Sequence, residues 1–483
     1  MKIKSWLSVV VLWASPLACG GLMDSGFGAT PGGVQDMGLA RELVENGTVP
    51  AAACFSVEGM FSEHELGLEG EACETTLCLR GGLGLAPDLD GREMAWFQVG
   101  LSSSIDIEEF TRPPLTVVAC VDVSGSMGWS YVGDEGPDPS PAALTHRLLG
   151  ALAAELGEGD RLAIVTYGSD VATPLALTPG TEQDQIRRVI DNLGANGSTN
   201  MEAGLIRAFE IAAGAGGEGH VRVMLFTDVQ PNVGATTASE FEGMVAEAAE
   251  QNVGLTVFGM GLGLGQEVLD AMVHLRGGNA FSLFEYDDVA ELISDDWPWL
   301  ACPIAHELKV LMTLPEGFKL GQAYGFPGDH DLREAGMEVA SVFLSKRRGA
   351  MLLRVEPENA EALSELSLTG RIDFEDLAGQ AHQTQLTAAA DGISVDARGH
   401  GYSQAAVART VSLALMVDGM RRAAERYAAN RSEAVDLMKQ VVNRLASDLG
   451  ATGDEALEIE LRFARDLLGL MEEGAPQGNL YPA

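Results

Sequence analysis

The chain has 483 residues, 46% of them hydrophobic, and its 31 basic and 70 acidic residues give a formal net charge of −39. This length is too great for one ordinary hydrophobic core and predicts roughly two to four domains of about 150 residues each. So acidic a chain would repel phosphate backbones, which excludes nucleic acid as a partner and favours cations or basic surfaces.

The amino terminus has the features of an export signal. Lys2 and Lys4 precede an apolar run over residues 7–14, which is too short to cross a bilayer as a permanent helix. Small residues then lead to Cys19. We therefore predict a signal peptide over residues 1–18, and no other stretch is long and apolar enough to predict a transmembrane helix.

This arrangement resembles a bacterial lipoprotein signal. The resemblance implies that Cys19 is lipidated, becomes the mature amino terminus and anchors the chain in the cell envelope, in the periplasm or at the outer-membrane surface. Pro16 departs from the leucine that is usual three residues before such a cysteine, so plain secretion remains an alternative.

Two segments separate the signal from the first clear domain. Residues 19–50 are rich in glycine, alanine and small polar residues and are predicted to form a flexible tether. Residues 51–113 mix strand-like pieces, notably 94–101, with turn signals. Because an exported chain can keep disulfides, we expect one bridge, with its pairing left open, among three cysteines of this segment: Cys54, Cys73 and Cys78.

From residue 114 to about 300, strand-like and helical patterns alternate. The alternation predicts an α/β domain, a doubly wound and mostly parallel sheet with right-handed crossovers. Strands are expected at 115–122, 161–167, 171–177, 221–228, 253–259 and 280–285, and helices at 141–155, 182–193, 201–213, 240–251, 267–275 and 289–293.

Oxygen-bearing side chains follow two of these strands. The buried-type strand at 115–122 ends on Asp122, and Ser124 and Ser126 follow at alternate positions. Asp228 ends a second apolar run, and Thr199 lies on a glycine-rich loop directly before a helical pattern. Ligands of open α/β sheets bind outside the carboxyl ends of the strands, where the strand order reverses. Such a set of carboxylates and hydroxyls suits a hard divalent cation.

These five residues, in this order, resemble the metal-ion-dependent adhesion site of von Willebrand factor A domains. The resemblance implies a Rossmann-like fold and a Mg²⁺, Mn²⁺ or Ca²⁺ ion held directly by Ser124, Ser126 and Thr199, with Asp122 and Asp228 acting partly through water. Neutral hydroxyl ligands leave most of the cation's charge uncompensated. An open coordination position should therefore attract a carboxylate from a protein partner.

The remainder of the chain has a strand-rich segment followed by a helical one. Residues 301–400 hold strand-like runs separated by turn signals and are predicted to form a β-sandwich-like unit. The resemblance to bacterial adhesion-type proteins, which often place an A domain within such a unit, implies that the strands before Pro113 pair with those after Cys302. Residues 401–475 are helical, with an apolar face that predicts a helical hairpin or small bundle. The expected strands of the β unit lie at 306–314, 339–345, 350–356, 364–374 and 383–387.

Enzymatic motifs are missing from the sequence. The eight histidines are scattered outside any H-E-x-x-H pair, and neither G-x-S-x-G nor a P-loop is present. We therefore predict a non-enzymatic, metal-dependent, adhesion-type envelope lipoprotein, of unknown oligomeric state, that captures an acidic group of a protein partner. Two alternatives remain: a structural envelope-assembly protein with a stabilising metal, and a hydrolase whose catalytic module is unrecognised.

Overall fold

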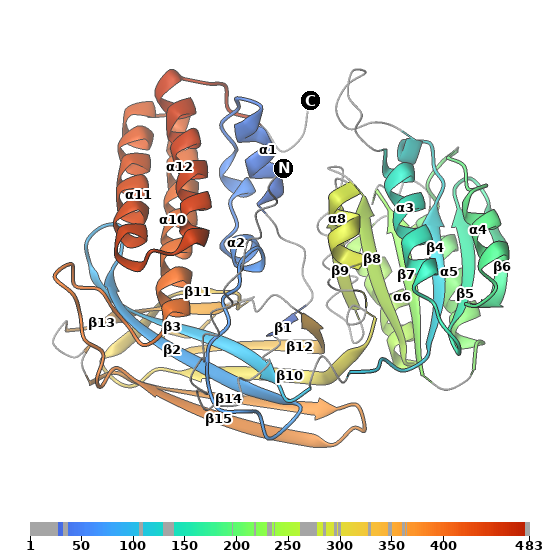
Figure 1. Ribbon diagram of the computed structural model, residues 1–483, viewed down its shortest axis with the longest axis horizontal. Helices are drawn as coiled ribbons and strands as arrows, with labels where there is room; N and C mark the ends of the chain where they lie inside the picture. Colours follow the sequence, from blue (N-terminus) through green and yellow to red (C-terminus); the bar gives the residue numbers. More distant parts are fainter. Residues whose placement is uncertain are drawn as a thin grey trace, which may run out of the picture.

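The computed structural model describes residues 28–31, 37–105, 110–128, 140–195, 197–216, 219–228, 234–235, 237–260, 278–283, 286–293, 297, 301–326, 330–345, 350–359, 363 and 365–478. The signal peptide predicted at 1–18, the lipidation site Cys19 and the helix predicted at 267–275 lie outside these residues. An α/β domain occupies one half of the molecule, and a β-sandwich covered by helices occupies the other (Figure 1).

The α/β domain is built on a six-stranded sheet in which only one edge strand is antiparallel. Its central strand is buried at every position because helices cover both faces, as the uninterrupted apolar run predicts. The order across the sheet is β6 (Val171–Pro179), β5 (Arg161–Tyr167), β4 (Leu115–Asp122), β7 (His220–Thr227), β8 (Val253–Met260) and β9 (Gly278–Leu283).

Helices pack on both faces of this sheet and form two separate apolar cores (Figure 1). Three of them cover one face: α3 (Pro141–Ala154), α4 (Gln183–Ile190) and α8 (Tyr286–Glu291). Among the described helices, two cover the other face: α5 (Met201–Ala213) and α6 (Ala238–Glu250). Helix α3 begins where Ser140 accepts a hydrogen bond from the Ala143 backbone N–H, with Pro141 at the first position.

The second half contains one antiparallel sheet of ten strands, folded into two layers around a shared core. One layer comprises β16 (Gly401–Tyr402), β2 (Leu77–Pro87), β3 (Glu93–Ser103), β13 (Met351–Pro357) and β11 (Phe318–Tyr324). The other comprises β1 (Gly28–Pro31), β12 (Glu334–Ser345), β10 (Pro303–Thr313), β14 (Ser367–Asp376) and β15 (Ala381–Ala389). The pairing of β3 with β13 confirms that strands preceding the α/β domain join strands that follow it.

Helices cover the outer face of the layer that contains β2 and β3 (Figure 1). Trp96 of β3 is completely buried beneath them and donates its indole N–H to the Ala86 carbonyl at 2.9 Å. The longer helices are α10 (Ala405–Tyr427), α11 (Arg431–Thr452) and α12 (Glu455–Glu473), and the shorter ones are α1 (Gly38–Glu45) and α2 (Val57–Ser62).

The C-terminal region, expected to be a helical hairpin or small bundle, is a small bundle of three helices. Two other expectations about these outer parts require correction. The tether predicted at 19–50 is wrong where the structure describes it, because β1 pairs with β12 and α1 packs against α12. Strands β2 and β11 were not predicted, because glycines interrupt their apolar patterns.

The predicted disulfide among the three nearby cysteines joins Cys73 to Cys78, whereas Cys54 is a buried free thiol. This bridge closes a short loop ahead of β2. Among the described helices, none is both long enough and apolar enough to cross a membrane.

The two halves meet where the chain enters and leaves the α/β domain. On the way in, Arg112 donates two hydrogen bonds to Asp160, at 2.8 and 2.5 Å, and its guanidinium lies over the Trp297 ring. On the way out, the buried Arg222 of β7 donates to the Ala301 carbonyl at 3.2 Å and lies over the ring of Phe343 in β12. The Arg222–Phe343 contact thus joins the α/β domain to the sandwich, and the Arg112–Asp160 pair fixes the entering chain to the α/β domain.

The Arg112–Asp160 contact should make the stability of this junction depend on pH. Burial alone would raise the pKa of Asp160, but hydrogen bonds from Arg112 and from the Gly157 and Leu115 backbone outweigh burial and hold that pKa below 3.8. The stabilisation is therefore complete above the unfolded-state pKa and is lost as pH falls through the lower folded-state pKa. We expect Asp160→Asn to lower the melting temperature at neutral pH, and we expect its gap to the wild type to begin to narrow only as pH falls below about 4, towards the lower folded-state pKa of Asp160.

Thermal unfolding of both proteins across this pH range would measure the effect, with the exposed Asp184→Asn as the control. A gap between wild type and Asp160→Asn that is constant with pH would contradict the role given to this carboxylate.

Candidate metal centre at the strand ends of the α/β domain

The two acidic residues predicted at strand ends lie on neighbouring parallel strands. Asp122 ends β4, and Asp228 directly follows β7, so both carboxylates lie at the same edge of the sheet. The chain first extends the sheet from β4 to β5 and β6, and then returns to the other side of β4 for β7, β8 and β9. This reversal of strand order creates the crevice in which open α/β sheets bind ligands.

The Asp122 carboxylate is buried and held from two sides. Its Oδ1 accepts the Ser124 backbone N–H at 2.8 Å, and its Oδ2 accepts the Thr227 hydroxyl at 3.2 Å. Burial, together with the nearby negative charge of Asp228, raises the pKa of Asp122 to about 6, although the hydrogen bonds from Ser124 and Thr227 oppose that rise. The site thus carries two buried carboxylates close enough to disfavour each other's charge.

The two predicted serines follow Asp122 in the turn after β4. Ser124 is buried at 1% exposure, and its Oγ lies 3.2 Å from the Oγ of the half-buried Ser126. The Val123 N–H donates to the Tyr167 carbonyl of β5 at 2.8 Å, which fixes the start of this turn to the neighbouring strand. Two hydroxyl oxygens therefore lie side by side beside the Asp122 carboxylate.

The loop that carries Thr199 lies against the same turn. Thr199 is 2% exposed, and two residues earlier the Gly197 carbonyl accepts the Gly125 N–H at 3.0 Å. Gly197 has a φ of +100°, and a Cβ there would lie 2.4 Å from the Ser169 Oγ, so only glycine suits this position. The structure thus brings together the three segments that carry the five predicted side chains.

Several residues that hold these segments were not predicted from the sequence. Ser169, in the turn after β5, accepts the Ser198 backbone N–H at 3.1 Å and so positions the Thr199 loop. Tyr167 is completely buried behind the site, and a Cβ on Gly204 of α5 would lie 2.6 Å from its ring. Thr227 is the last residue of β7. No local pattern distinguishes these residues, because their role depends on which strands become neighbours.

The donor chemistry of this centre fits a divalent cation. Among the described residues, no group of three or more His, Cys, Asp or Glu side chains is arranged to hold a metal. The oxygen donors gathered at this edge are instead two carboxylates and the neighbouring serine hydroxyls. A hard cation prefers such oxygen ligands. A cation would also compensate the charge of the two buried carboxylates, of which Asp122 has its pKa raised mainly by burial and further by Asp228.

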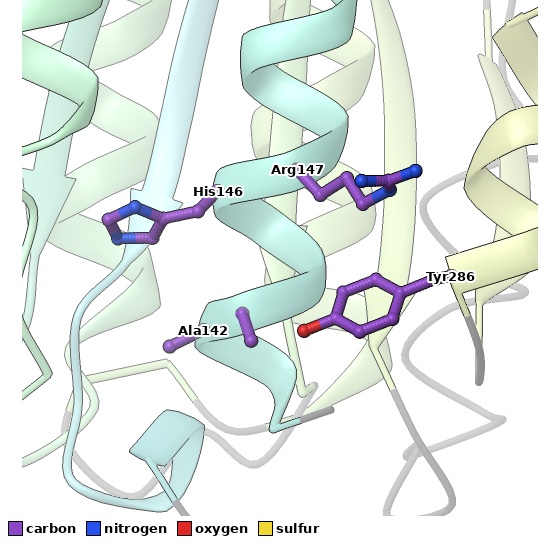
Figure 2. Close-up of a pocket in the computed structure, with 5 residues that line it drawn as sticks. Ala142, His146, Arg147 and Tyr286 are labelled. Carbon is purple, nitrogen blue, oxygen red and sulfur yellow. The ribbon is translucent and has the colours of Figure 1, made fainter. Parts of the chain in front are cut away.

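A different pocket, of about 580 Å³, lies between α3 and α8 (Figure 2). It is lined by Ala142, Ala143, His146, Arg147 and Tyr286, and Figure 2 shows Arg147 and Tyr286 on neighbouring elements. The Arg147 guanidinium lies 5.3 Å from the Tyr286 ring centroid. None of these lining residues belongs to the strand-end cluster, so the pocket is separate from the candidate metal centre.

The doubly wound sheet and the cluster at its carboxyl edge define an α/β domain with a strand-end ligand site. Residues 117–230 match the family model described as "von Willebrand factor type A domain". The chain therefore contains a von Willebrand factor type A domain, a class that typically mediates protein–protein interaction.

The chain matches relatives over part of its own length and part of theirs. The chain is 30% identical over 199 residues to the uncharacterized protein YfbK of Escherichia coli, a match that spans 41% of this chain and 33% of YfbK. It is 24% identical over 204 residues to pig inter-alpha-trypsin inhibitor heavy chain H4, covering 41% of this chain and 21% of that protein. A solved von Willebrand factor type A protein from Catenulispora acidiphila aligns with 85% of this chain and 99% of its own, at 13% identity and a TM-score of 0.48.

Proposed function

We propose that this protein binds another protein through a divalent cation held at the strand-end centre. Ser124, Ser126 and Thr199 would contact the ion directly, and Asp122 and Asp228 would balance its charge, partly through water. When bound, the ion would offer an open coordination position to a carboxylate of the partner. We propose no enzymatic activity.

The observation that carries this proposal is the pairing of two buried carboxylates with adjacent serine hydroxyls at the edge where β4 and β7 end. Hydroxyl ligands leave the cation more electrophilic than a cage of carboxylates would, which favours an acidic ligand from outside. The chain's net charge of −39 adds a second requirement. A partner should surround its carboxylate with basic residues, because an acidic surface would be repelled before docking.

The proposed cellular localisation rests on the amino-terminal sequence. Lys2, Lys4, the short apolar run and Cys19 support export and a lipid anchor in a bacterial envelope, with secretion as the alternative. A tethered binding protein of this kind would hold its partner at the envelope surface.

The test of this function is partner capture with and without a chelator. The immobilised protein should retain partners from envelope extract in Mg²⁺, release them in EDTA and recover them when Mg²⁺ is restored in excess. Equal capture in EDTA would contradict a metal-dependent function. If EDTA lowered only the melting temperature and left capture intact, the ion would be structural, because a ligand of the native state adds RT ln(1 + [L]/Kd) to stability.

A further inference from the structure

We propose that Glu202 is a positioning residue for the metal centre, which ties the segment after Asp228 to the helix after Thr199. The Glu202 Oε2 accepts the Ala235 backbone N–H at 2.8 Å. The inference rests on the function proposed above, because it assigns Glu202 a role in shaping that centre rather than in contacting the ion.

The Glu202 side chain starts from a fixed place near Thr199. Helix α5 begins at Met201, and Asn200 caps it by accepting the Ala203 N–H at 3.2 Å. The Asn200 N–H in turn donates to the Gly168 carbonyl at 3.3 Å. Glu202 lies in the first turn of α5, where a negative charge is favoured by the helix N-terminus. Its carboxylate is therefore anchored to the same short segment that supplies the Thr199 oxygen.

The segment after Asp228 approaches this carboxylate closely. Gly234 has a φ of +78°, and a Cβ there would lie 2.5 Å from the Glu202 Oε2 and 3.0 Å from the Asn200 Oδ1. Only glycine leaves room for that approach in this backbone conformation. The Glu202 carboxylate thus contacts the backbone of Gly234 and Ala235 directly.

Glu202 completes a set of links among the metal-site segments. The Gly125 N–H to Gly197 carbonyl bond joins the serine turn to the Thr199 loop, and the bond from Ala235 to Glu202 joins that region to the Asp228 segment. On its other side, Asp228 is fixed by the end of β7. Loss of the Glu202 link would release the backbone at Ala235 from the Thr199 region, so these two segments would have to be ordered relative to each other when the ion binds. Removing such outer supports typically costs about 10- to 100-fold in metal affinity.

Calorimetric titration of the full chain with Mn²⁺ tests this role. We expect Glu202→Ala to weaken Mn²⁺ binding about 10- to 100-fold. We expect Glu202→Gln to bind within about threefold of the wild type, because its amide oxygen can still accept the Ala235 N–H. The matched control is Glu210→Ala on the same helix, an exposed glutamate paired with Arg207, which should bind like the wild type.

The outcomes separate this inference from the function on which it rests. Wild-type affinity in Glu202→Ala, with binding lost in Asp122→Ala, would overturn the positioning role alone. Equal loss in Glu202→Ala and Glu202→Gln would also overturn it, since the charge rather than the hydrogen bond would then matter. Full Mn²⁺ binding by Asp122→Ala would instead refute the proposed metal centre. Circular dichroism of each metal-free variant verifies that it is folded.

Discussion

Asp122→Ala is expected to abolish metal-dependent partner capture and to weaken Mn²⁺ binding by about 100-fold or more, beyond the usual effect of removing an outer support. The substitution removes one of the two carboxylates at the site and also the acceptor that holds the Ser124 N–H and the Thr227 hydroxyl. Calorimetry measures the affinity directly. Thermal unfolding gives a second reading, because Mg²⁺ at 100 times its Kd should stabilise the wild type by about 2.7 kcal/mol and the variant by almost nothing.

Two control variants make the result specific. Asp122→Asn keeps a hydrogen-bond acceptor for Ser124 but loses the charge, so it should retain the fold and still bind Mn²⁺ weakly. Asp170→Ala alters an exposed acidic residue beside Ser169 and should behave like the wild type. The metal-free Asp122→Ala protein should remain folded, since it loses a carboxylate whose charge is disfavoured by burial and by Asp228. Metal-dependent capture that survives in this variant would contradict the proposed function.

Most of the α/β domain could be predicted because its central strands are uninterrupted apolar runs that are buried on both faces, and because helices such as α3 and α5 have recognisable start signals. Strand β5 and helix α5 have the predicted bounds, β8 is one residue longer than predicted, and β7 is shifted from its predicted position by one residue at each end. The sequence around Asp122 and Asp228 carried enough information to place both at the same sheet edge, since each acid follows an apolar run of parallel-strand type. That placement depends on local pattern and on a general rule of topology.

The supports of the centre could not be predicted in the same way. Ser169 and Glu202 act through contacts with the backbone at Ser198 and Ala235, which are distant in sequence. A serine in a turn and a glutamate in a first helical turn are common for local reasons, so neither residue signals a tertiary role. Their roles emerge only when the loops are assembled in space.

The outer parts of the molecule were harder to predict for a different reason. Helix α10 is buried along most of its length, so it lacks the contrast between apolar and polar faces that identifies a surface helix. On α11 the predicted apolar face was broadly right, but Asp448 lies within it and is only 3% exposed. Amphipathic periodicity assigns an acidic residue to solvent, whereas this one lies at the centre of a buried hydrogen-bond network.

Asp448 joins α11 to the helix beside it and to the sandwich. Its Oδ2 accepts the Ser412 hydroxyl of α10 and the Arg444 Nε, both at 2.9 Å. Its Oδ1 lies 3.2 Å from the Arg398 Nη1 and 3.3 Å from the His400 Nδ1. Arg444 also donates to the Pro87 carbonyl of β2 at 2.8 Å, so the network reaches the sheet beneath the helices.

Asp448→Ala should therefore be among the most destabilising single substitutions in the helical layer. It leaves the Arg444 guanidinium, 14% exposed, without its carboxylate partner, and breaking a buried ion pair from one side costs about 3–5 kcal/mol. Asp448→Asn, which keeps the volume and one acceptor, should cost clearly less, and Asp436→Ala on the exposed face of α11 should cost almost nothing. Urea unfolding monitored by far-ultraviolet circular dichroism compares the three variants. A loss under about 1 kcal/mol in Asp448→Ala, the range of an exposed ion pair, would mean that water replaces the carboxylate and that helix packing alone holds α10 and α11 on the sandwich.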